Sequence, residues 1–158
     1  MQLKTQQHDA VINSPIGKLG IVVVANKLVK IDFLPRQSST LVTHNFVIQQ
    51  TIKQLKEYFC HPRVRFKIPL CLAGTPLQQQ IWQAIQRIPC GKTMTYGELA
   101  QKIATSPRVI GNACRCNPIP LVIPCHRVVA ATDLGGYCGK GNKNRLLIKQ
   151  WLLDFEQK

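Results

Sequence analysis

Two turns divide residues 11–34 into segments whose hydrophobic pattern is typical of β-strands. Ser14–Gly17 forms the first turn and Asn26-Lys27 the second. Between the two turns, residues 19–25 are a β-branched apolar run. After the second turn, residues 28–34 alternate between apolar and polar side chains. This pattern predicts a hairpin.

A helix is predicted over residues 45–59, where apolar side chains recur at helical spacing. The side chains on this stripe are Phe46, Ile48, Ile52, Leu55 and Phe59. His61-Pro62 ends the helix, and Phe66–Leu72 fits a further strand. Residues 1–74 are therefore expected to form a small α/β domain, in which we find no chemistry.

The pattern becomes mainly helical after Gly74. Thr75 is a good N-cap, and Pro76 suits the first position of a helix. One apolar stripe follows, made of Leu77, Ile81, Ala84, Ile85 and Ile88. Pro89–Gly91 ends this helix.

Two short helices with a tight turn between them come next, and they predict a helix-turn-helix motif. Thr95-x-x-Glu98 is a capping-box pattern that begins the first helix. Ser106-Pro107 gives a cap and a proline to the second helix, residues 108–116, which Asn117-Pro118 ends. In this motif the second helix commonly enters a groove of DNA.

The last third of the chain predicts an extended segment and a final helix. Ile119–Ile123 is apolar, reads as extended, and leads into Pro124–Arg127. A glycine-rich loop follows at 135–139, and a helix starts near Lys143. Its expected apolar face carries Leu147, Ile148, Trp151, Leu152 and Phe155. The chain is thus expected to be α+β, with an N-terminal α/β domain (1–74) and a mainly helical C-terminal domain (75–158).

The charge of the chain narrows the choice of partners. It has 158 residues, with 21 Lys and Arg against 7 Asp and Glu, a net charge of +14. The excess is spread over both halves of the chain, which argues against a disordered basic tail. Basic side chains release counterions from phosphates, so this balance favours a nucleic acid as partner. A basic protein with no nucleic-acid role is the alternative.

The cysteines indicate a reducing compartment. There are seven, an odd number, and the N-terminus has no apolar signal core. No apolar run is long enough to span a membrane. We therefore expect reduced thiols in the cytoplasm. No Cys-x-x-Cys occurs and the four His lie far apart, so neither a metal site nor another cofactor is expected.

Cys125 is a candidate nucleophile because His126 follows it directly. A thiol attacks well only as a thiolate, and a His oriented by a carboxylate can generate one. Glu156 is the candidate carboxylate. Neighbours on a strand face opposite ways, so contact between Cys125 and His126 needs a turn or a bridging water. On these residue types alone, a small buried core cysteine is the slightly better interpretation.

A set of motifs favours Cys125 as a nucleophile over Cys125 as a core residue. In order along the chain they are Pro76–Trp82, Ile88–Gly91, Thr95–Ala100, Asn117-Pro118, Ile123–Val128, Gly136-Tyr137 and Trp151–Glu156. Through them residues 75–156 resemble the catalytic domain of the O6-alkylguanine-DNA alkyltransferases. Residues 1–74 resemble that family's variable N-terminal domain only loosely. The resemblance implies a ribonuclease H-like N-terminal domain and a winged-helix-like C-terminal one.

The resemblance implies a DNA-repair reaction in which the protein is consumed. Cys125 is expected to take the alkyl group from guanine O6 as a stable thioether. His126, through a water, would accept the thiol proton while Glu156 orients the imidazole. Tyr96 would donate a proton to guanine N3. The implied partner is double-stranded DNA containing O6-alkylguanine. The protein is expected to be a monomer that does not bind membranes, and O4-alkylthymine is a second candidate substrate.

The resemblance also assigns residues to DNA and to the substrate pocket. The damaged base must leave the duplex. Tyr96 would crowd a phosphate, and Arg108 would fill the vacated stack. Further DNA contacts are expected on the second helix of the motif, at Asn112, Ala113 and Arg115. The expected pocket residues are Asn117, Pro120, Val128, Tyr137 and Cys138, with the backbone groups of Cys125 and Val128 on the guanine amine and the Cys138 N–H on O6.

Two departures and two alternatives stay open. Residues 101–107 are shorter than the family's usual turn, and 140–145 form a longer loop beside the alkyl pocket, so alkyl-size preference is not determined.

A cysteine hydrolase using Cys125, His126 and Glu156 would turn over through an acyl intermediate. A non-catalytic module is the other alternative: alkyltransferase-like sensors lack the cysteine, and helix-turn-helix regulators show sequence preference and usually dimerise.

Overall fold

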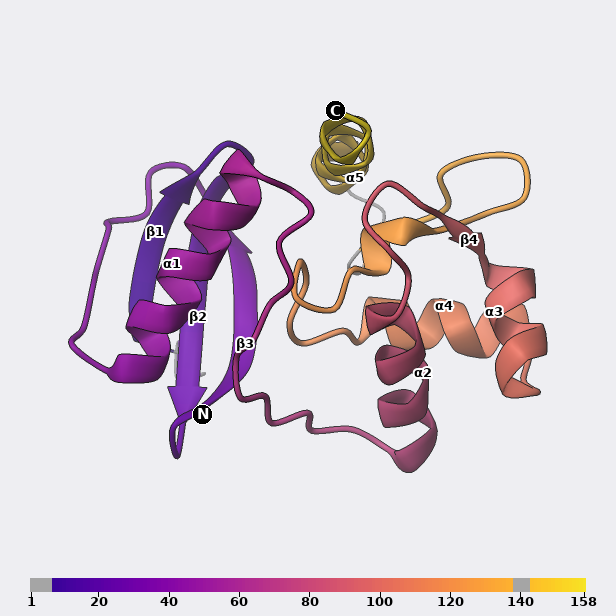
Figure 1. Ribbon diagram of the computed structural model, residues 1–158, viewed down its shortest axis with the longest axis horizontal. Coiled ribbons are helices and arrows are strands. Elements are labelled where there is room, and N and C mark those ends of the chain that lie inside the picture. The colour runs from indigo at the N-terminus through magenta and orange to yellow at the C-terminus, as the bar shows by residue number, and fades with distance from the viewer. Residues whose placement is uncertain (1–6, 138–142) are drawn as a thin grey trace, which may run out of the picture. The chain divides into compact units, whose positions relative to one another are not determined.

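The computed structural model describes residues 7–137 and 143–158, and the chain divides into two compact units, residues 1–72 and 73–158 (Figure 1). Cys138 and residues 140–142 of the 140–145 loop lie outside the described residues, and residues 143–145 belong to the last helix. Among the residues that are described, no helix has the length and apolarity needed to cross a membrane.

The first unit contains an antiparallel sheet of three strands in the order β1-β2-β3. The strands are β1 (Ala10–Ser14), β2 (Gly17–Val24) and β3 (Lys27–Leu34). The β2–β3 turn is formed by Ala25 and Asn26, with φ of 49° and 58°, the backbone that a tight two-residue hairpin requires. The predicted hairpin is therefore confirmed, with its turn one residue earlier than expected.

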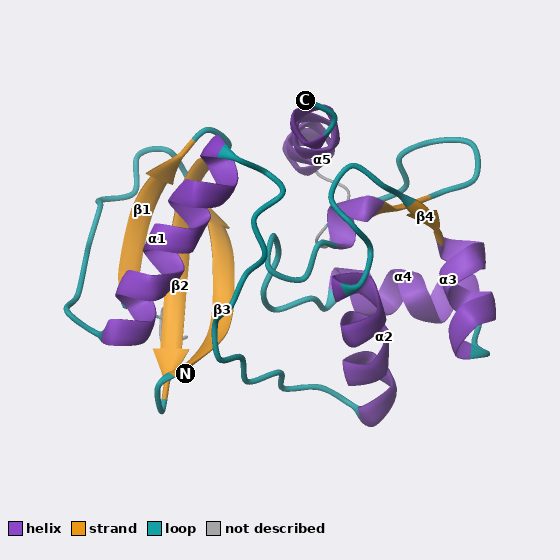
Figure 2. Ribbon diagram, viewed as in Figure 1, coloured by secondary structure: helices purple, strands orange, loops and turns teal. Residues whose placement is uncertain are grey.

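Helix α1 (Phe46–Cys60) packs on one face of this sheet and contacts all three strands (Figure 2). Asn45 caps it by accepting hydrogen bonds from the N–H groups of Val47 and Ile48. Ile48, Ile52 and Leu55 are buried as predicted. Phe46 is 75% exposed, so its place on the buried stripe was predicted wrongly.

The strand predicted at Phe66–Leu72 does not form. Only a single parallel bridge joins Leu70 to Leu28 in β3. Its hydrogen bonds run from Leu28 N–H to Pro69 O and from Cys71 N–H to Leu28 O. Pro69 has no N–H, which limits further pairing.

The second unit begins with three helices. Helix α2 (Pro76–Gln86) starts at the predicted Thr75 cap, which the structure shows to be a capping box with Gln78. Helices α3 (Tyr96–Ile103) and α4 (Pro107–Arg115) pack on each other. Between them Ala104 adopts a left-handed conformation (φ 62°) and Ser106 caps α4. These features confirm the helix-turn-helix.

Residues 119–123 are not extended as predicted but form a tight, buried turn. Leu121 has a φ of 75°, and the Ile123 N–H donates to Ile119 O at 2.9 Å. The turn leads into a short 3₁₀ helix, η1 (Cys125–Arg127), and then into β5 (Val128–Val129). Strand β5 pairs in parallel with β4 (Met94–Thr95) just before α3, which brings Tyr96 into the same region as η1.

Helix α5 (Lys143–Glu156) starts where predicted, and its buried face includes Leu152 as expected but also two charged residues that were not placed on that face. Lys149, Leu152 and Glu156 are 0%, 0% and 1% exposed, whereas Leu147 is 67% exposed. The expected apolar face was thus wrong at Leu147. A lysine and a glutamate occupy buried positions because each finds charged or carbonyl partners there. This helix contacts η1, the short turn that contains Cys125 and His126.

Candidate active site

Cys125 and His126 lie together in the buried turn of η1. Cys125 is 2% exposed and His126 is fully buried. The Cys125 N–H donates to Ile123 O and the Arg127 N–H to Pro124 O. A 3₁₀ turn replaces the strand that would have sent the two side chains to opposite faces, so both remain inside the second unit.

Asn117 holds this turn at the sulfur. Its side-chain amide donates to Ile123 O at 2.9 Å and to Cys125 Sγ at 3.1 Å. Its side-chain oxygen accepts from the Ile119 N–H at 3.0 Å. One side chain therefore fixes the loop that follows α4 and supplies a hydrogen-bond donor to the thiol.

The imidazole of His126 is oriented by Glu156. Nε2 lies 2.7 Å from Glu156 Oε1. An ionised carboxylate only accepts, so Nε2 carries the hydrogen and Nδ1 carries the lone pair. Nδ1 is buried and has no hydrogen-bond partner within the described part of the chain. His126 is thus arranged as a base.

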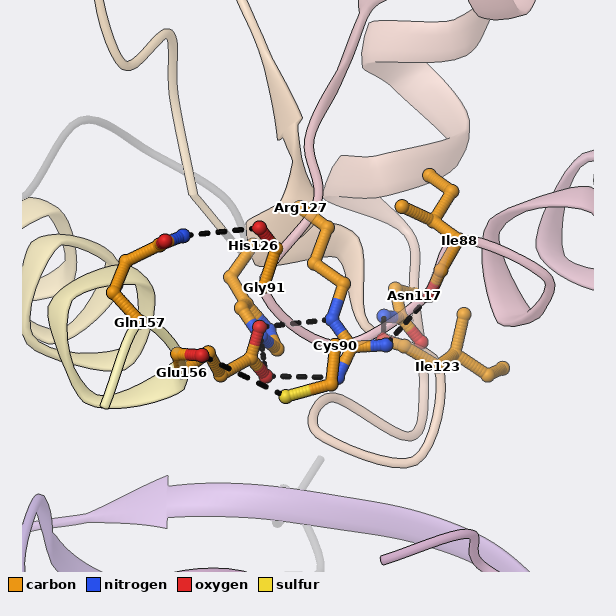
Figure 3. A network of polar contacts seen from close by, with 9 residues as sticks. All are labelled: Ile88, Cys90, Gly91, Asn117, Ile123, His126, Arg127, Glu156 and Gln157. Atoms are coloured by element: carbon orange, nitrogen blue, oxygen red, sulfur yellow. Dashed lines mark hydrogen bonds and ion pairs between the residues drawn. The ribbon is translucent and has the colours of Figure 1, made fainter. Parts of the chain in front are cut away.

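Arg127 completes the network around the same carboxylate (Figure 3). Its Nε donates to Glu156 Oε2 at 2.9 Å and its Nη2 to Oε1 at 2.8 Å. Its Nη1 donates to Ile88 O at 2.7 Å. A bidentate guanidinium–carboxylate pair of this kind is strong and directional. It pins the end of α5 to η1.

The network sets the protonation states of the pair. Burial lowers the pKa of His126, outweighing the hydrogen bond that its Nε2–H donates to Glu156, which favours the charged form of the imidazole. Burial alone would raise the pKa of Glu156, but hydrogen bonds from His126 and Arg127 hold it well below its usual range. At neutral pH the base is therefore unprotonated and its carboxylate ionised.

Tyr96 stands at the start of α3 with its hydroxyl 3.5 Å from Gly136 O, to which it donates. The loop lies close against its ring: Gly135 has φ +68°, and a Cβ there would come within 2.7 Å of the ring. Burial raises the pKa of Tyr96 to about 12, helped by the nearby thiols of Cys114 and Cys125. The hydroxyl therefore keeps its proton at neutral pH and can donate it.

A pocket of about 420 Å³ opens between α4, Tyr96 and the 136–137 segment. Five of the predicted residues line it: Tyr96, Arg108, Asn112, Arg115 and Tyr137. Pro107, Gly111, Cys114 and Gly136 line it too and were not predicted. Arg108, Asn112 and Arg115 are exposed, so α4 presents basic and polar groups at the mouth of the pocket.

Some predicted residues lie elsewhere. Ala113 is only 1% exposed and its carbonyl accepts a hydrogen bond from Trp82, so its side chain faces the core and the expected DNA contact is withdrawn. Pro120 and Val128 are buried and, with Asn117, lie outside the pocket lining. Cys138 is not among the described residues. Within the described ranges, no cluster of His, Cys, Asp or Glu is placed to hold a metal.

Two family profiles match the chain, one for each unit. Residues 76–158 match "6-O-methylguanine DNA methyltransferase, DNA binding domain", and residues 8–72 match its "ribonuclease-like domain". The chain belongs to the 6-O-methylguanine DNA methyltransferase family.

Individual members of the family are similar to this chain over most of its length. A methylated-DNA–protein-cysteine methyltransferase from Metallosphaera sedula is 37% identical, covering 85% of this chain and 86% of the relative. The Mycobacterium tuberculosis counterpart is 35% identical over 90% of each. A crystal structure of the M. tuberculosis protein in complex with DNA superposes with a TM-score of 0.79, at 35% identity, over 93% of this chain and 91% of that one.

Two buried cations near the site of this family member, Arg127 and Lys149, were not predicted as functional from the sequence. Arg127 was visible only as part of the Pro-Cys-His-Arg run. Lys149 is fully buried and donates to Val128 O at 2.7 Å and to Gly136 O at 2.9 Å. The spacing of Lys149, Leu152 and Glu156 is helical, so a signal for this face existed. It was hidden because two of its three members are charged.

Proposed function

We propose that the protein repairs DNA by moving the alkyl group of O6-alkylguanine irreversibly to its own Cys125. One observation carries this assignment: Cys125 is buried beside a donor, Asn117, and next to a His126 whose Nδ1 is open while Glu156 holds Nε2. This is a thiol and base arrangement of the kind used for nucleophilic attack. The family membership supplies the substrate class.

In the proposed reaction the Cys125 sulfur attacks the alkyl carbon attached to O6. A carbon–sulfur bond forms, and the electron pair of the carbon–oxygen bond passes to the guanine. His126 Nδ1 takes the thiol proton through a water, and the ionised Glu156 stabilises the resulting imidazolium. The thioether is stable, so each molecule reacts once.

Tyr96 balances the charge on the leaving base. As negative charge moves from O6 into the ring, the hydroxyl of Tyr96 donates to guanine N3. Its raised pKa keeps this proton in place before reaction. The proton lost by the thiol finally passes, through His126 and Tyr96, to the guanine product.

We propose that the protein acts as a monomer in the cytoplasm and that it binds duplex DNA through α4. Arg108 takes the place of the flipped base, while Asn112 and Arg115 contact the backbone beside it. Sequence-independent affinity comes from phosphate contacts and the net charge of +14. All of these groups lie in residues 75–158, to which we assign DNA binding and alkyl transfer.

Mass spectrometry tests the proposal. After incubation with duplex DNA containing O6-methylguanine, the protein should gain one methyl group, and digestion should place it on Cys125. Cys125→Ser should gain nothing, whereas Cys60→Ser, which removes an exposed thiol of the first unit, should react normally. Turnover without a lasting adduct would instead support the hydrolase, and no reaction together with a strong preference for one DNA sequence would support a regulator.

A further inference from the structure

We infer that Lys149 is a positioning residue that keeps the Tyr96 hydroxyl available to the substrate, because Lys149 is the stronger of two donors to Gly136 O and leaves Tyr96 only weakly bound to that oxygen. The inference rests on the proposed alkyl transfer and concerns a residue that touches neither the alkyl group nor the sulfur in the reaction described above.

The burial of Lys149 requires an explanation. A lysine ammonium is rarely buried fully, because leaving water costs it free energy unless hydrogen bonds compensate. Here the side chain is fully buried, and Nζ donates to two backbone carbonyls, Val128 O at 2.7 Å and Gly136 O at 2.9 Å. The two carbonyls belong to separate segments: β5, directly after η1, and the loop that lies against Tyr96.

Gly136 O is shared between two donors of unequal strength. The Lys149 ammonium donates at 2.9 Å, and the Tyr96 hydroxyl at 3.5 Å. A charged donor at short distance dominates a neutral donor at the limit of hydrogen bonding. The carbonyl oxygen accepts both hydrogen bonds, but the ammonium of Lys149 draws on its electron density and forms the stronger bond, so the Tyr96 hydroxyl is held only weakly. A weakly held hydroxyl can turn to guanine N3 at little cost.

Lys149 also locates the ring itself. Nζ lies 5.9 Å from the centroid of the Tyr96 ring, within the range of a cation–π contact. On the loop side, Gly135 approaches the ring so closely that no Cβ would fit. The loop bound by Lys149 is thus the one that packs on Tyr96, and releasing it would change where the hydroxyl points.

The charge of Lys149 also acts electrostatically on groups near the nucleophile, which is a route to the reaction rate that does not involve Tyr96. Lys149 acts on the pKa of Cys114 and of His126, lowering both, although burial is the larger influence on each. The charged and titratable groups around the sulfur come from α3, α4, η1 and α5: Tyr96, Cys114, His126, Arg127, Lys149 and Glu156. An effect through the nucleophile would not need Tyr96. The experiment must separate the two routes.

A double-mutant cycle does so. Lys149→Met removes the charge with little change in length, and Tyr96→Phe removes the hydroxyl. The rate constant for thioether formation is measured with free O6-benzylguanine for the wild type, both single variants and the double variant. We expect Lys149→Met to slow the wild type about tenfold but the Tyr96→Phe protein only about twofold, because coupled residues give non-additive effects.

The controls define what would overturn the inference. Lys143→Met removes an exposed lysine from the same helix and should react at the wild-type rate. Alkylation of Cys125 by iodoacetamide, followed on its peptide, should be unchanged in Lys149→Met. An equal slowing by Lys149→Met in both backgrounds, or slowed iodoacetamide alkylation, would refute the positioning role. If Lys149→Met does not fold, Lys149→Gln replaces it in the same cycle. A wild type that forms no thioether would refute the proposed function itself.

Discussion

The side-chain amide of Asn117 lies 3.1 Å from the sulfur of Cys125 and donates to it. The same amide closes the turn that follows the helix-turn-helix through Ile123 O. Asn117, two positions past the end of α4, therefore controls both the position of the nucleophile and the polarity around it. This relationship links the proposed DNA-binding helix directly to the reacting atom.

Asn117→Asp is expected to slow the reaction of Cys125 severely. A carboxylate has nearly the same shape, but it cannot donate to the sulfur and it repels a thiolate. Loss of the two donated hydrogen bonds should also lower the free energy of unfolding by about 1–3 kcal/mol. Quenched time courses with O6-benzylguanine measure the reaction rate, and urea unfolding measures the change in stability. Asn13→Asp, an exposed change in β1, is the matched control and should alter neither.

Glu156→Gln is expected to destabilise the protein and reduce its reactivity. The change leaves Arg127 and His126 buried without their carboxylate, and breaking a buried pair in this way typically costs about 3–5 kcal/mol. Thermal and urea unfolding measure the loss. Asp154→Asn, an exposed change on the same helix, should stay within about 0.5 kcal/mol of the wild type.

The effect of Glu156 should also depend on pH. Its pKa is lower in the folded than in the unfolded protein, so the stability it contributes is present above the unfolded value, about 4.3, and is lost as the pH falls toward the folded value. The difference in unfolding free energy between wild type and Glu156→Gln should therefore be constant from pH 6 to 7 and shrink below about pH 4. A difference that grows on acidification would contradict the ion pair.

Tyr96→Phe should bind methylated duplex DNA almost as tightly as the wild type but transfer the alkyl group more slowly, by about 10²-fold if it is the proton donor. Because the pKa of Tyr96 is raised to about 12, the wild-type rate should show no titration of this group below pH 10. Binding by anisotropy and single-turnover transfer separate the two steps. Normal transfer by the variant would exclude the proton-donor role.

Arg108→Ala should weaken repair in duplex DNA far more than reaction with free O6-benzylguanine. The free base needs no flipping, so only the duplex reaction uses the exposed arginine at the start of α4. Comparing the rate constants for the two substrates measures the contribution. Arg36→Ala, which removes an exposed charge from the first unit, serves as the control. Equal losses on both substrates would contradict a role in base flipping.

Local signals in the sequence were enough to predict most of the helices. The Thr75 and Thr95 capping boxes and the Ser106 cap act through neighbouring backbone N–H groups, so a few adjacent residues contain all the information. The motif around Cys125 likewise identified the family. Where tertiary packing dominates, the same approach failed: it made residues 119–123 extended, placed Leu147 and Phe46 on buried stripes, and put Ala113 on the DNA side.

The sequence by itself determined which residue types were present for the reaction: a thiol, a histidine, a tyrosine, a distant glutamate and a basic helix. Only the tertiary structure decided how they act together. The turn at Cys125 exists because Asn117 and the buried chain around it outweigh the extended preference of an apolar run. The partners of Glu156 are 29 and 30 residues away in sequence. The burial of Lys149 depends on two carbonyls from separate segments, and no local pattern encodes such long-range pairs of hydrogen-bonding groups.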